Sequence, residues 1–127
     1  MSYKEIEDKL KDIKIEEFVW IIYIGIIIYS FYSNYLERKY YLTGDILSKE
    51  KYRKTLIIIF SILLIVYFYF LHDSYESVLN LTSNDSDNKQ KFTYLSFIGS
   101  LLIFISGVIF LYIAYNDEQI DVELAFN

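Results

Sequence analysis

Hydrophobic residues gather in three uninterrupted blocks, separated by shorter charged stretches. The blocks cover residues 18–36, 55–71 and 92–115, and none of them contains Asp, Glu, Lys or Arg. Roughly 20 helical residues are needed to cross about 30 Å of bilayer hydrocarbon, which is close to the length of each block. The pattern predicts an all-α membrane protein with three transmembrane helices, near residues 17–41, 49–73 and 91–116.

The first block allows one alternative, because Ile and Tyr also favour β-strands. A pair of buried strands would need turn residues between them, and none divides residues 18–36. The helical interpretation is therefore preferred.

The segment before the first block, residues 1–16, is charged but carries an apolar stripe. Tyr3, Ile6, Leu10 and Ile13 recur at spacings of three and four, which places them on one side of a helix. We expect a short N-terminal amphipathic helix that lies on the membrane or pairs with a partner helix. It precedes a three-helix transmembrane domain, residues 17–116, and an acidic C-terminal tail, residues 117–127.

Two polar connectors join the blocks. Residues 37–54 contain the turn signal Thr43, Gly44 and Asp45, and Ser48 is expected to cap the second helix. Residues 72–91 form the other connector, and the Ser, Asn and Asp residues within it predict a long, mobile loop.

Composition removes several classes of function. The chain has no Cys and one His, so it offers no thiolate site and little for a histidine-based metal centre. A net charge of −5 argues against nucleic-acid binding, which needs an excess of Lys and Arg. His72, Asp73 and Glu76 lie close together in sequence, but such a group is usually a solvated helix end. We expect no enzyme activity, no cofactor and no metal.

The orientation in the membrane is not decided by the positive-inside rule, because each side carries six Lys and Arg residues. The bases of residues 37–54 flank the second block more closely than those on the other side. We therefore expect a bacterial cell membrane protein with its N-terminus outside and its C-terminus in the cytoplasm.

Small residues mark one face of the third block as a candidate site for helix packing. Small side chains let helix backbones approach closely in lipid, so this helix is predicted to make the closest backbone contact in the protein. Two alternatives stay open, an oligomer interface and packing within the chain. The residues are Ser96, Gly99, Ser100, Ser106, Gly107 and Ala114.

Two functions fit these features. The preferred one is a non-enzymatic accessory or structural subunit that contacts the lipid bilayer and other membrane proteins. The rival is self-association into a pore. In its small size, three spans and charged ends the chain resembles phage holins and small bacteriocin-immunity or superinfection-exclusion proteins. No motif carries this resemblance, and the acidic tail departs from the basic tail of many holins.

Overall fold

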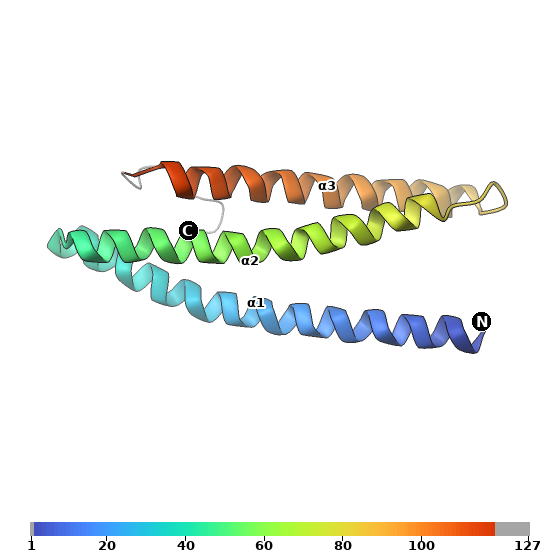
Figure 1. Ribbon diagram of the computed structural model, residues 1–127, viewed down its shortest axis with the longest axis horizontal. Helices are drawn as coiled ribbons and strands as arrows, with labels where there is room; N and C mark the ends of the chain where they lie inside the picture. The colour runs from blue at the N-terminus through green and yellow to red at the C-terminus, as the bar shows by residue number, and fades with distance from the viewer. Residues whose placement is uncertain (1, 119–127) are drawn as a thin grey trace.

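Three long helices run antiparallel along one axis (Figure 1). The computed structural model describes residues 2–118, so most of the acidic tail lies outside the described residues. The central helix α2 packs against both others, whereas α1 and α3 make no close backbone contact with each other in this part of the chain. The helices are α1 (Tyr3–Thr43), α2 (Ile46–Leu79) and α3 (Asp87–Asn116).

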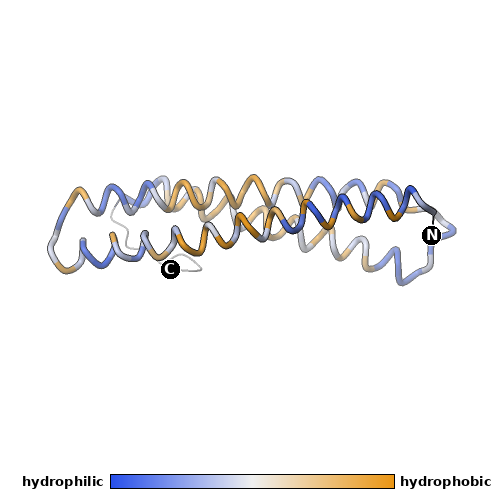
Figure 2. Tube along the Cα trace, turned by 90° about the horizontal axis from the view of Figure 1, so that it is seen from below, coloured by the Kyte–Doolittle hydropathy of each residue, from blue (hydrophilic) through white to orange (hydrophobic). Residues whose placement is uncertain are grey.

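All three helices are long and apolar enough to span a membrane. They contain 41, 34 and 30 residues, more than the roughly 20 that a span requires. The apolar residues gather along the middle of the molecule and the hydrophilic ones near its ends (Figure 2). The prediction of three long apolar helices is confirmed, and residues 2–118 contain no strand.

Residues 3–16 belong to α1 and do not form a separate helix, so the expected start of the first long helix near residue 17 is wrong. The Ser2 hydroxyl accepts a hydrogen bond from the Glu5 amide at 3.2 Å, and the Glu5 carboxylate accepts one from the Ser2 amide at 3.3 Å. This capping box starts the helix. No Gly or Pro interrupts residues 3–24, so α1 continues directly into the first apolar block.

The turn between α1 and α2 forms where the sequence predicts it. Gly44 has a left-handed backbone with φ +70°, and its amide donates to the Tyr40 carbonyl at 2.7 Å. The predicted cap at Ser48 is wrong, because the Asp45 carboxylate caps α2 by accepting from the Leu47 amide at 3.1 Å. Ser48 lies inside α2 and donates to the second Asp45 oxygen at 2.8 Å.

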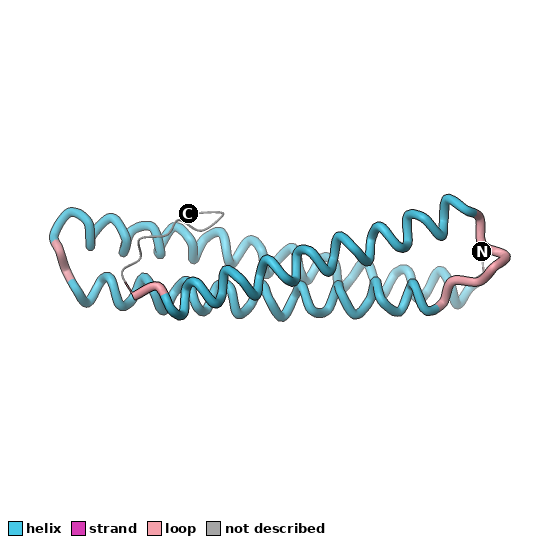
Figure 3. Tube along the Cα trace, turned by 90° about the horizontal axis from the view of Figure 1, so that it is seen from above, coloured by secondary structure: helices cyan, strands magenta, loops and turns pink. Residues whose placement is uncertain are grey.

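The second connector is shorter than predicted (Figure 3). α2 continues to Leu79 and α3 begins at Asp87, which leaves residues 80–86 outside the helices. The Ser86 hydroxyl caps α3 by accepting from the Lys89 amide at 3.1 Å. Leaving the apolar block does not end a helix, since polar residues 72–79 satisfy the backbone of α2 as well as apolar ones do.

The buried core lies toward the Gly44 end of the bundle. Ile59 of α2 is fully buried, and the rings of Phe60 and Phe110 lie 5.7 Å apart between α2 and α3. Most of the cluster comes from α2, which explains its central position. Its members are Leu36, Tyr52, Leu56, Ile59, Phe60, Leu63 and Ala114.

A hydrogen bond between two buried hydroxyls joins α1 to α2 beside this core. The Thr55 hydroxyl lies 3.1 Å from the Ser33 hydroxyl and 2.6 Å from the Tyr52 carbonyl. Both hydroxyl-bearing residues are at least 96% buried. Because α1 is held to α2 here and its backbone does not approach that of α3 within residues 2–118, a gap remains between α1 and α3.

Candidate functional site

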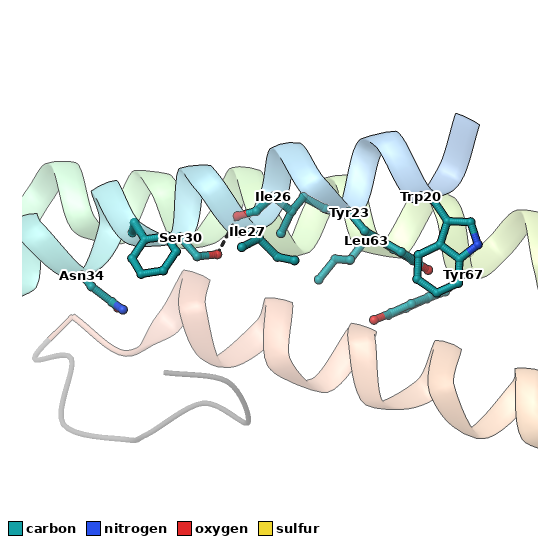
Figure 4. Close-up of a pocket in the computed structure, with 9 residues that line it drawn as sticks. Trp20, Tyr23, Ile26, Ile27, Ser30, Asn34, Leu63 and Tyr67 are labelled. Carbon is teal, nitrogen blue, oxygen red and sulfur yellow. Dashed lines mark hydrogen bonds between the residues drawn. The ribbon is translucent and has the colours of Figure 1, made fainter. Parts of the chain in front are cut away.

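An open trough lies between α1 and α3, with α2 as its floor. Its apolar half is a cavity of about 520 Å³ lined by α1 and α2. Trp20, Ile27 and Phe31 come from α1, while Leu63 and Tyr67 rise from α2. Figure 4 shows the side chains of this half directed into the gap that faces α3. Aromatic and branched side chains make this half suitable for hydrocarbon.

The polar half of the trough adjoins the apolar half. It is a cavity of about 320 Å³, and it shares Tyr23 and Tyr67 with the apolar half, so the two form one continuous trough. In this half, residues of α3 form one wall of the trough. The other lining residues are Phe70, Asp73, Ser74 and Ser77 of α2 and Ser96, Ser100 and Ile103 of α3.

Asn34, Ser96 and Ser100 are among the polar side chains of the trough that make no hydrogen bond within residues 2–118. By contrast, the Ser30 hydroxyl donates to the Ile26 carbonyl at 2.7 Å. All three lie within the apolar blocks, where a polar group without a partner is costly. The trough can therefore offer hydrogen bonds to a guest.

Acidic side chains surround the end of the trough farthest from Gly44. Asp12 and Glu16 of α1 and Asp73 of α2 line a small cavity of about 50 Å³. A neighbouring cavity of about 310 Å³ joins Glu16 to Trp20, and so connects this acidic mouth to the trough. Among the described residues, no Lys or Arg lines any of these four cavities. The mouth therefore favours positive charge.

The predicted packing residues Gly107 and Ala114 are buried against the rest of the same chain. A Cβ placed on Gly107 would lie 3.1 Å from Tyr67 Cδ2 and 3.2 Å from Leu64 Cδ1, both on α2. Ala114 belongs to the buried core. These two residues therefore make contacts within the chain, and an oligomer interface on the same helix stays a prediction.

The other four predicted residues do not share those contacts. Ser96 and Ser100 line the polar half of the trough, and a Cβ on Gly99 would meet open space. The Ser106 hydroxyl donates to the Ile103 carbonyl of its own helix at 2.7 Å. Their role in helix packing remains a prediction.

The group formed by His72, Asp73 and Glu76 is divided by the structure. His72 Nε2 lies 3.7 Å from a Glu76 oxygen, and both side chains are about 60% exposed. Asp73 instead joins Asp12 and Glu16 at the acidic mouth. No group of three His, Asp or Glu side chains within residues 2–118 is arranged to hold a metal ion.

Sequence reasoning missed two contacts between helices. Arg53 of α2 donates to the carbonyl oxygens of Ala114 and Tyr115 at the end of α3, whereas the sequence showed only a basic residue beside an apolar block. The Ser33 and Thr55 pair had a usable signal, since each residue lies eleven positions from Gly44. Equal distances from a tight turn bring two residues of a helical hairpin to the same level.

No protein-family model matches this chain, and no curated protein or solved structure is significantly similar to it. Its function is therefore argued from its own geometry. The features that can bind another molecule are the apolar trough, its polar groups without partners and the acidic mouth.

Proposed function

We propose that this protein is integral to the membrane and serves as a non-enzymatic accessory subunit of a membrane complex. The observation that carries the proposal is the unbroken course of α1 from Tyr3 to Thr43. Residues 3–16, which we call the arm, continue the axis of the first apolar block beyond its end.

The arm projects away from the bilayer. From Phe18 to Tyr3 the helix rises about 22 Å, whereas the polar head-group layer on each side is only about 5 to 8 Å thick. A helix that runs straight on from a membrane span cannot also lie flat on the surface. Tyr3 and Leu10 are 87% and 58% exposed, so the apolar stripe of the arm lacks cover within residues 2–118.

The stripe has the form of one side of a two-helix seam. Tyr3, Ile6, Leu10 and Ile13 follow the alternating spacing of three and four that coiled coils use. Charged residues flank the stripe, as expected for a helix that pairs in water. The partner that fits is a helix of another membrane protein, projecting from the same side of the bilayer and carrying its own apolar seam.

We place the protein in a bacterial cell membrane, with the arm outside and the Gly44 turn in the cytoplasm. Arg53 and Lys54 directly precede the second apolar block, which supports a cytoplasmic turn. The chain has no Cys, so single cysteines can report this orientation. Asn84→Cys should react with a membrane-impermeant maleimide in intact cells, and Gly44→Cys should react only after lysis. The reverse result would invert the orientation.

The accessory role is tested by a photo-crosslinking residue in the arm, in cells whose membranes retain the protein after carbonate extraction. A crosslinker at Leu10 should capture one defined membrane protein, and a crosslinker at Lys11, off the stripe, should not. When Ile6, Leu10 and Ile13 are all replaced by Gln, a crosslinker placed at another position of the arm should no longer capture the partner protein.

Three results would contradict the proposal. Release of the protein by carbonate would exclude membrane integration, and equal capture from Leu10 and Lys11 would show that the stripe recognises nothing. Dye leakage and toxicity on expression of this chain alone would favour the holin-like pore.

A further inference from the structure

We propose that the trough holds a single-chain amphiphile with a cationic head group. The hydrocarbon tail occupies the apolar half, and the head group lies at the acidic mouth formed by Asp12, Glu16 and Asp73. This site is separate from the exposed stripe of the arm, and its existence does not depend on the accessory role.

The apolar half has the size and length of a hydrocarbon site. Its volume of about 520 Å³ falls in the range of roughly 300 to 1,000 Å³ for small-molecule pockets. Its α1 wall runs from Trp20 to Asn34, about 21 Å of helix, which exceeds the roughly 15 Å of hydrocarbon in one leaflet. A single extended chain of lipid length therefore fits along it.

The acidic mouth lies where a head group belongs. Glu16 precedes the first apolar block by two residues, and Asp73 follows the second by two. Both carboxylates thus lie at the edge of the hydrocarbon region. Asp73 faces Asp12 and Glu16 of α1 and has Glu76 on its own helix, so negative charge prevails. An ammonium group balances this charge, whereas a carboxylate or phosphate is repelled.

Polar groups along the trough support the same assignment. Ser96 and Ser100 lie in the polar half, next to the path from the mouth to the apolar half. Their hydroxyls have no partner within residues 2–118 and can accept hydrogen bonds from an ammonium group. The polar end and the apolar end of the trough thus match the two ends of one amphiphile.

Trp20 lines the trough and is the single Trp of the chain, so its fluorescence reports occupancy. The full chain, purified in a neutral detergent, is titrated with hexadecylamine, hexadecanol and hexadecanoate, three probes with one tail and different head groups. Like Lys, the amine is protonated at neutral pH. We expect a saturable response with a stoichiometry near one, and about tenfold tighter binding of the amine than of the other two, equivalent to roughly 1.4 kcal/mol.

Variants separate the head-group contact from the tail contact. Asp73→Asn should remove most of the preference for the amine over the alcohol and leave binding of the alcohol unchanged. Glu16→Gln is a second test of the mouth, should Asp73→Asn fail to fold. Asp87→Asn is a matched charge change outside the trough, and it should alter neither the preference for the amine nor the binding of the alcohol. Ser30→Leu, which adds bulk to the apolar half, should weaken binding of all three probes.

Several results would overturn the proposal. Equal affinity for the three probes would show that the mouth does not recognise a cationic head group. An unchanged preference for the amine in both Asp73→Asn and Glu16→Gln would show the same. A response that rises linearly with probe concentration would show partition into the micelle, leaving the trough to a protein helix. None of these measurements involves a partner protein, so they are independent of the crosslinking test on the arm.

Discussion

Arg53 Nε donates a hydrogen bond to the Ala114 carbonyl oxygen at 3.2 Å, and the same guanidinium also contacts the carbonyl of Tyr115. The last carbonyls of a helix have no partner within the helix and carry partial negative charge. Arg53 therefore caps two carbonyls of this group from α2, and it supplies the positive charge that the last turn of α3 does not contain. The contact fixes the C-terminal end of α3 beside the start of α2.

Removing this cap should destabilise the protein. Arg53→Met keeps much of the side-chain length but loses the donors, and hydrogen bonds to charged groups contribute about 1.5 to 3 kcal/mol. Because Arg53 is only half-buried, we expect a loss of about 1 kcal/mol, seen as a lower midpoint of thermal unfolding in detergent. Lys54→Met, at the exposed neighbouring position, is the control. Equal midpoints for both variants would show that the cap contributes nothing.

Two glycines of α3 should respond oppositely to added side chains. Gly107→Leu must displace Tyr67 and Leu64, and overpacking of this kind costs about 1 to 3 kcal/mol. Gly99→Ala meets open space and should stabilise the helix by up to about 1 kcal/mol. Thermal unfolding measures both effects. An unchanged midpoint in Gly107→Leu would show that the α2 and α3 contact is loose.

The hydroxyl pair between α1 and α2 should show measurable coupling. Thr55→Val and Ser33→Ala each remove one partner of the 3.1 Å contact. Double-mutant cycles for hydrogen bonds between membrane helices average about 0.6 kcal/mol, and we expect a coupling energy of that order. Ser30→Ala, which loses only a bond within its own helix, should not couple to Thr55→Val. Additive effects of Ser33→Ala and Thr55→Val would contradict the contact.

Acidification should weaken the Gly44 turn. The hydrogen bond from the Ser48 hydroxyl lowers the pKa of Asp45 below its ordinary value of 3.8, with help from the Leu47 amide and Lys39. A carboxylate with a lowered folded-state pKa stabilises the fold above its unfolded-state pKa, and this contribution is lost as pH falls through the folded-state value. The midpoint temperature of thermal unfolding should therefore decrease as the pH is lowered below about 4.

The matched variants for that titration are Asp45→Asn and Glu50→Gln. Asp45→Asn should reduce the dependence on acid, because it removes the group that titrates. Glu50→Gln removes an exposed carboxylate of the same helix and should leave the dependence unchanged. A titration identical in Asp45→Asn and the unaltered chain would exclude Asp45 as the source.

Block length and charge placement were sufficient to predict the helices, because a bilayer leaves few structures for 17 to 24 apolar residues. Helix ends were harder to predict. Ser48 was predicted to cap α2, but Asp45 is the cap. Residues 72–79 were predicted to be part of a loop because they are polar, but they are helical, since contact with water does not unwind a helix.

The trough was not predictable from the sequence, because it depends on which helices touch. Three spans can pack as a closed triangle or as a row, and the pattern of apolar residues is compatible with both. The acidic mouth joins Asp12 and Asp73, which are 61 residues apart and become neighbours only through the packing of α1 on α2. Small residues indicated a contact for Gly107, but not that Ser100, seven residues earlier, would face a cavity.

The unbroken course of α1 also sets the direction in which the arm faces. Ile13, Trp20, Ile27 and Asn34 follow one another at intervals of seven residues, and a straight helix turns by only about 20° over each such interval. The stripe of the arm and the α1 wall of the trough therefore share one side of the same rod, within about 60°. A helix paired with the arm would stand over the acidic mouth, so that whatever enters or leaves the trough at that end must pass it.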